Sequence, residues 1–185
     1  MPLLQTRADA SAQGYGFLGA TSTGAFYQIQ QLSPSAVSTI TFSSIPSTYK
    51  SLQVRFNLIV SVGTTLAIQF NGDAGSNYAW HYIAGTGSAA SGGGTASTTS
   101  MGLNVAGVTN AVTTYPNVGI IDVIDYANAN KNKVTKTLFG GNNNTSTGPI
   151  EINSGLWLNT AAITSLTLFV GSGTFTGTIT LYGAN

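Results

Sequence analysis

The chain has 185 residues, of which 42% are hydrophobic and only 6% are charged, whereas about 25% of the residues of a typical soluble domain are charged. This length suits one domain with its own core, with or without a terminal arm. Six basic residues against five acidic ones leave a formal charge of +1. We therefore expect neither nucleic-acid binding through a basic surface nor attraction of cations to an acidic one.

The shortage of charge also bears on association. A surface built from Ser, Thr, Asn, Gln and Gly provides little electrostatic repulsion to keep copies apart, so we predict a protein that works within an assembly, as a homo-oligomer. The absence of cysteine excludes disulfides, thiolate nucleophiles and thiolate zinc sites. The N-terminal residues have neither the pattern of a secretory signal nor an apolar run near 18 residues, so we expect neither a signal peptide nor a membrane span.

Residues 1–25 show no regular period and combine small residues with isolated large apolar ones. A flexible tail does not need such apolar side chains. We predict an extended N-terminal arm that orders against a partner; the alternative is a frayed terminus with some local packing. The candidate partner-binding residues of the arm are Leu3, Leu4, Arg7, Tyr15, Phe17 and Leu18.

From residue 26 onward, apolar residues alternate with Thr, Ser and other polar residues, which is the period of half-buried strands. Many short strands separated by turn residues are typical of a sandwich or barrel. We predict an all-β domain over residues 26–185, a jelly-roll-like antiparallel β-sandwich. The expected strands are 26–32, 37–42, 52–60, 65–70, 78–83, 100–105, 118–126, 133–140, 156–159, 163–170 and 175–183. The Gly/Ser/Thr-rich segment 85–100 is expected to be a mobile surface loop.

The stretch FNGDAGSNYAWHYI (70–83) holds the only histidine beside an acid and several amides. Asn71-Gly72 between two apolar runs is a strong hairpin signal, because both central positions of a type I′ turn need positive φ. Asp73 and Asn77 are expected to bond to the same loop. A calcium loop needs several carboxylates at alternate positions, so the sequence favours a structural turn over a metal site.

Catalytic chemistry finds little support in the sequence. His81 has no evident nucleophile or orienting partner, and no G-x-S-x-G elbow occurs. Asp122 and Asp125 lie three apart on an expected strand and so face opposite ways; pairing with Lys131, Lys133 or Lys136 across a hairpin is the plainer expectation. We therefore predict no catalytic residues, no cofactor-binding residues and no metal ligands, and hence a protein that is not an enzyme.

Three blocks carry a family resemblance: TITFSSIPSTYKSLQVRFNL (39–58), LAIQFNGDAGSNYAWHYI (66–83) and LWLNTAAITSLTLFVGSGTFTGTITLYG (156–183). They resemble a group of tailed-bacteriophage virion proteins, and the FNGD-x-GSNY block and the LYG ending are the most specific parts. The resemblance implies a non-enzymatic β-sandwich on the virus particle and brings no catalytic residues.

On this basis we expect a capsid decoration or cement protein that forms a homotrimer and whose partners are the major capsid protein or other virion proteins. Its location is the virion, on the capsid surface rather than the tail. The first alternative is a tail-associated or head-fibre receptor-binding module that holds host glycans. Its sugar-stacking candidates are Tyr78, Trp80, Tyr82, Tyr115 and Trp157. The second is a glycan depolymerase, for which the paired carboxylates of glycosidases are not visible.

Overall fold

The computed structural model describes residues 26–103, 115–142, 144 and 148–185. These residues form two antiparallel sheets, and no α-helix occurs among them. The larger sheet has eight strands, in the order β1 (Tyr27–Leu32), β12 (Phe175–Ala184), β3 (Ser51–Val60), β8 (Asn117–Ile124), β9 (Lys133–Gly141), β10 (Ile150–Trp157), β5 (Tyr78–Gly85) and β6 (Ala90–Thr98). The smaller sheet has four, in the order β2 (Thr39–Phe42), β11 (Leu166–Val170), β4 (Leu66–Phe70) and β7 (Met101–Gly102).

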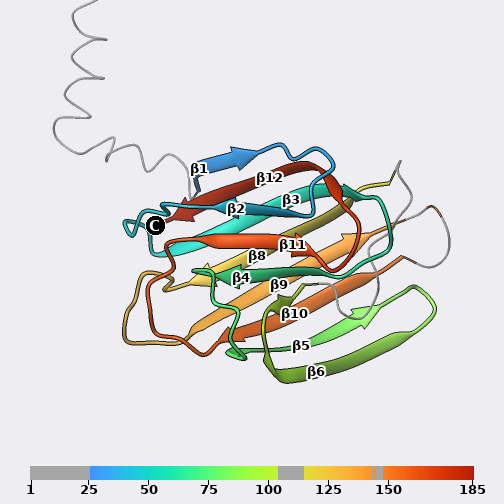
Figure 1. Cartoon of the computed structure of the whole chain (residues 1–185). Helices are drawn as coiled ribbons and strands as arrows, with labels where there is room; N and C mark the ends of the chain where they lie inside the picture. The colour runs from blue at the N-terminus through green and yellow to red at the C-terminus, as the bar shows by residue number, and fades with distance from the viewer. Residues whose placement is uncertain (1–25, 104–114, 143, 145–147) are drawn as a thin grey trace, which may run out of the picture.

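Strand pairing shows that the core of the fold is a jelly roll. β1 pairs with β12, β2 with β11, β3 with β8 and β4 with β7, always antiparallel. This is a long two-stranded ribbon rolled up so that its successive pairs fall alternately in the two sheets, which gives the two Greek keys of a jelly roll. The predicted sandwich is confirmed (Figure 1).

Two inserted strand pairs widen one sheet. β5 and β6 lie in sequence between β4 and β7, and β9 and β10 lie between β8 and β11. The two pairs meet at the β10–β5 ladder, which extends the larger sheet beyond β8. The larger sheet is thereby twice as wide as the smaller one (Figure 1).

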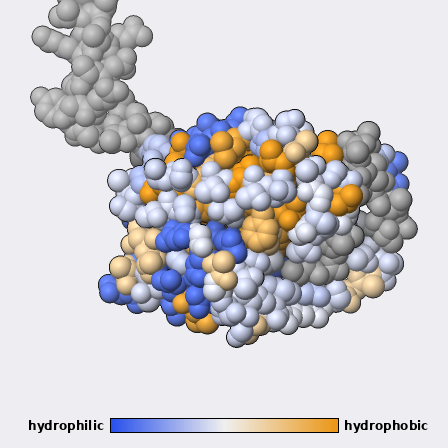
Figure 2. All heavy atoms as spheres, viewed as in Figure 1, coloured by the Kyte–Doolittle hydropathy of each residue, from blue (hydrophilic) through white to orange (hydrophobic). Residues whose placement is uncertain are grey.

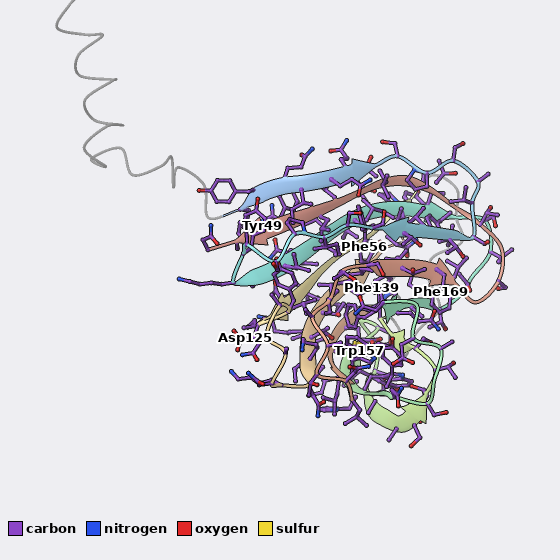
Figure 3. All side chains as sticks on the ribbon, turned by 60° about the vertical axis from the view of Figure 1, so that its left-hand side comes forward. Tyr49, Phe56, Asp125, Phe139, Trp157 and Phe169 are labelled. Carbon is purple, nitrogen blue, oxygen red and sulfur yellow. The ribbon has the colours of Figure 1, made fainter. Side chains whose placement is uncertain are left out.

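The core forms where the two sheets face each other. Strand β3 shows the underlying pattern: Val54, Phe56 and Leu58 are buried, and Arg55 and Asn57 between them are exposed. Because successive side chains of a strand point to opposite faces, one face of β3 enters the core. Figure 3 shows Phe56, Phe139 and Trp157 inside the sandwich and Asp125 at its margin.

The predicted mobile loop over 85–100 is wrong, because most of it is strand β6, which pairs along β5. Backbone hydrogen bonds do not depend on side-chain type, so a neighbouring ladder can order a glycine-rich segment. Close packing also leaves little space for a side chain at these glycines. A Cβ on Gly94 would lie 2.8 Å from Cβ of His81, and one on Gly93 would lie 3.1 Å from the ring of Tyr82.

Strand β10 is also longer than expected, since it begins at Ile150 rather than at residue 156. Of the expected strand 100–105, only Met101–Gly102 is a strand among the described residues. The other expected strands agree with the structure to within a few residues at each end.

Gly119 tests the packing between the larger sheet and the core. A Cβ on this residue would overlap the ring of Phe56, and overpacking a core typically costs about 1–3 kcal/mol. We expect Gly119→Ala to lower the free energy of unfolding by that amount in urea titrations. The matched control is Gly171→Ala in the turn after β11, away from the outer face of the larger sheet, where the nearest atom to a new Cβ is Oγ1 of Thr64 at 3.5 Å. Equal effects of the two changes would contradict this packing.

Candidate functional site: the exposed face of the larger sheet

The FNGD segment forms a corner between the two sheets. Asn71 and Gly72 have φ values of 53° and 67°, and the N–H of Asp73 donates to the carbonyl of Phe70, as the predicted tight turn requires. The predicted hairpin is wrong, however. The strand before the turn, β4, pairs with β11 and β7, whereas the strand after it, β5, pairs with β10 and β6. The turn therefore carries the chain from one sheet into the other.

Asp73 holds this corner together. Its carboxylate accepts hydrogen bonds from the N–H of Gly75 at 2.9 Å, from Nδ2 of Asn77 at 2.9 Å and from Nε1 of Trp157 at 2.7 Å. These bonds, that of Trp157 first, lower the pKa of the Asp73 carboxyl below its ordinary value. Donors from the chain itself occupy both oxygens of the carboxylate, which gives Asp73 a structural role in this corner. Within the described residues no cluster of three or more His, Asp or Glu side chains offers a metal site.

The sugar-stacking candidates separate into two groups. Tyr78 is fully buried and Trp157 is 1% exposed, and their rings stack on each other at 6.3 Å between centroids. Neither ring can lie against a sugar. Trp80, Tyr82 and Tyr115 are half-buried, and Trp80 and Tyr82 form a tilted pair at 6.2 Å.

The remaining titratable candidates are dispersed. His81 is exposed and faces Ser154 across the β5–β10 ladder. Glu151 is buried on the opposite face of the larger sheet, where its oxygen accepts from Nδ2 of Asn153 at 3.3 Å. Asp122 and Asp125 make ion pairs with Lys136 at 3.5 Å and with Lys131 at 2.8 Å, which confirms the predicted carboxylate–lysine pairing across the hairpin.

Two details of that prediction are corrected. Asp125 does not share a strand with Asp122, because β8 ends at Ile124 and Asp125 occupies the following turn with φ 54°. Lys133 does not pair with a carboxylate. Its Nζ is buried and donates to the backbone carbonyls of Asn128, Lys131 and Thr160 at 2.6–2.9 Å, so it ties the β8–β9 connection to the chain after β10.

The six candidate partner-binding residues of the arm, Leu3, Leu4, Arg7, Tyr15, Phe17 and Leu18, lie outside the described residues. Their role stays a prediction. Among the described residues, no helix has the length and apolar character needed to cross a membrane.

The feature most suggestive of function is the outer face of the larger sheet, turned away from the smaller one. It carries large apolar side chains that are between 36% and 74% exposed. We refer to the following set as the apolar face: Ile83, Val118, Ile120, Ile124, Val134, Leu138, Ile150 and Ile152. They come from β5, β8, β9 and β10, so most of them belong to the inserted strands. Contiguous exposed apolar surface of this kind marks interaction sites in monomeric proteins.

A single polar row crosses this face. Nε of Arg55 donates to Oε1 of Gln53 at 2.6 Å, and Nε2 of Gln53 donates to Oδ1 of Asp122 at 2.7 Å. The second oxygen of Asp122 pairs with Lys136 at 3.5 Å. The guanidinium of Arg55 lies against the rings of Phe26 and Tyr182, 4.7 and 4.9 Å from their centroids. The row holds two cations, Arg55 and Lys136, and one carboxylate, Asp122, so it carries a single net positive charge beside the apolar residues.

Two shallow hollows lie on the same face. One, of about 400 Å³, is mainly apolar, and its lining includes Gly140, Val118, Ile120, Leu138 and Ile150. The other, of about 510 Å³, is bordered by Asp122, Ile124, Val134 and Lys136. By contrast, the side of the molecule in Figure 2 shows mainly pale, weakly polar side chains with hydrophobic ones scattered among them.

The sequence analysis did not identify this face, although a signal for it was present. In GIIDVI (119–124), Ile121 and Val123 point into the core, while Ile120 and Ile124 point outward. Strands covered on both faces read as nearly continuous hydrophobic runs rather than as alternating ones. GIIDVI departs from strict alternation in this way and could have indicated a second covered face.

Comparisons with known proteins identify no family. No family model matches the chain, and no curated protein matches it. A solved structure with a weak likeness is that of an engineered GH43 glycoside hydrolase described as showing endo-xylanase and exo-arabinofuranosidase activity. It is 15% identical with a TM-score of 0.33, and 86% of this chain aligns with 36% of that one. The chain thus spans about a third of that protein, and a likeness this weak carries no argument.

Asp73 predicts a specific pH dependence of stability. Its pKa is lower in the folded protein than in the unfolded chain, so its stabilising effect is full above the ordinary Asp pKa of about 3.9 and is lost as the pH falls through the folded-state value. We expect the free energy of unfolding to fall less steeply between about pH 5 and pH 2 in Asp73→Asn than in the wild type. The measurement is urea unfolding at each pH, with Ser76→Ala in the same exposed loop as the control. Parallel curves for Asp73→Asn and wild type would contradict the role of the carboxylate.

Proposed function

We propose that this protein is a non-enzymatic structural component of a tailed-bacteriophage virion, and specifically a capsid decoration protein that binds and stabilises the shell. The observation that carries the proposal is the apolar face, whose polar row carries only one net positive charge. In a protein that functions as a monomer in water, such a surface is normally buried under another element or carries charged side chains. A protein that is built into an assembly buries it instead.

Three further features support a role in assembly. The chain has a formal charge of only +1, which permits dense packing of copies with little repulsion. The fold is a jelly roll, an architecture found among viral capsid and lectin domains. The three sequence blocks that resemble phage virion proteins include the FNGD corner and the last strand, which are both structural elements here.

The predicted arm supplies the attachment in this proposal. The described chain begins at Phe26, whose ring lies against Arg55 and Tyr182 at the margin of the outer face. A weak contact of each arm with the capsid would be multiplied by avidity if several arms bind one shell.

The glycan-binding alternative keeps one specific observation, the half-buried Trp80–Tyr82 pair. It loses Tyr78 and Trp157, which are part of the core. The pair alone gives a much smaller aromatic platform than the sequence indicated, so we place this function second.

The test is sedimentation of the purified full chain with phage heads emptied of DNA and, separately, with isolated tails. We expect the chain to pellet with heads and not with tails. In the full-length chain, Leu3→Ser, Leu4→Ser and Phe17→Ser together should weaken head binding by about tenfold or more, since burial of each large side chain is worth about 1.5–3 kcal/mol. Gln5→Ser with Gln13→Ser is the matched control.

The outcomes separate the possibilities. Binding to heads that survives the three apolar changes would remove the arm from the account but keep decoration. Binding to tails or to host cells, with none to heads, would favour the receptor-binding function. Binding to neither would contradict a virion role.

A further inference from the structure

We propose that the apolar face binds the same face of a second copy of the chain, across a two-fold axis that runs parallel to the strands between β8 and β9. The pair is thus formed by two larger sheets packed face to face, with the smaller sheets outside. The inference names a partner for the surface on which the proposed function rests. Its test is independent of any virus particle.

The charges at the centre of the face fit this arrangement. Asp122 of β8 and Lys136 of β9 are direct neighbours in the β8–β9 ladder. A two-fold axis between these strands places β8 of one copy over β9 of the other, at the same height along the strand. Asp122 then meets Lys136 of the second copy, and Lys136 meets the second Asp122. The four side chains form a neutral square of alternating sign, which fixes the register of the two copies.

The apolar neighbours of this ion pair obey the same symmetry. Ile120 and Leu138 are partners in the ladder of one copy. Across the axis, Ile120 of each copy therefore covers Leu138 of the other copy. Val118 is paired with Gly140, and both line the apolar hollow of about 400 Å³. The side chain of Val118 of each copy therefore enters the hollow of the other copy. A self-complementary pattern of this kind is what an isologous contact requires.

The size of the face is sufficient for a stable pair. Strands β3, β8, β9, β10 and β5 are adjacent, and with a spacing of about 4.8 Å and a rise of about 3.3 Å per residue they cover roughly 24 by 26 Å. The accessible area of such a patch exceeds its projection of roughly 600 Å², which brings it near the 800 Å² per partner of a standard interface. Stacked sheets twist by about 30° relative to each other, so the contact is best at the β8–β9 centre.

The experiment is sedimentation velocity and equilibrium of the full chain over a concentration series. We expect the wild type to form dimers. This differs from the homotrimer expected for a decoration protein, because a two-fold contact closes at two copies. Asp122→Lys leaves the centre of the face with two positive charges, and Lys136→Asp leaves it with two negative ones. Each variant alone should dissociate, with the dissociation constant raised about 30-fold or more.

Mixing the two variants in equal amounts is the decisive step. The doubly positive face then meets the doubly negative one, and a one-to-one heterodimer should form again. Thr41→Lys and Thr41→Asp are the matched controls, because Thr41 is exposed on the smaller sheet and these changes should leave the wild-type dimer intact. If either centre variant fails to fold by circular dichroism, Leu138→Lys replaces it and should give a monomer, while Thr41→Lys stays dimeric.

The proposal is overturned if the wild type is monomeric up to about 100 µM, or forms only trimers. It is also overturned if the folded centre variants dimerise as well as the wild type, or if their mixture stays monomeric. Head binding is scored separately in the sedimentation test described above. Dimers that do not bind heads would contradict the decoration function and support this interface. Monomers that bind heads would support the decoration function and contradict this interface.

Discussion

A strand that is apolar on both of its faces has to be covered on both, and the rest of this structure depends on how that requirement is met. The jelly roll covers one face of the larger sheet with the four strands of the smaller sheet. The inserted strands β5, β6, β9 and β10 widen the larger sheet without adding a layer on its outer side. Its outer side therefore presents isoleucine, leucine and valine to solvent around one polar row. The fold therefore leaves this apolar surface exposed, and a partner is needed to bury it.

The corner at Asp73 is the second constraint, because it fixes how the two sheets meet. β4 and β5 are consecutive strands in different sheets, so the chain turns out of one layer and into the other at Asn71-Gly72. Asn71 fastens the turn to the loop before β11 through Thr164 N–H and the Ala162 carbonyl. Asp73 fastens it to Trp157 of β10. The FNGD segment therefore connects the strands of the jelly roll to the inserted strands.

The sequence predicted the fold class and most strands, because alternation reports which side of each strand is buried. It missed β6 because Gly92, Gly93 and Gly94 form a strand only through pairing with β5, and pairing is not visible in local composition. The prediction of a hairpin at the FNGD turn was wrong, because the residues of a turn specify the local backbone conformation but not which strands pair afterwards. The apolar face was missed since Ile83, Val134 and Ile152 come from separate segments, and only the sheet order brings them together.

The central claim is that the apolar face is buried when the protein is assembled. The most direct measurement is methyl NMR of the isoleucine-labelled full chain with a soluble paramagnetic probe, at high and at low protein concentration. The account predicts that the methyl signals of Ile83, Ile120, Ile150 and Ile152 are protected from the probe at high concentration and broadened after dilution. Signals from these four residues that are equally broadened at every concentration would contradict it.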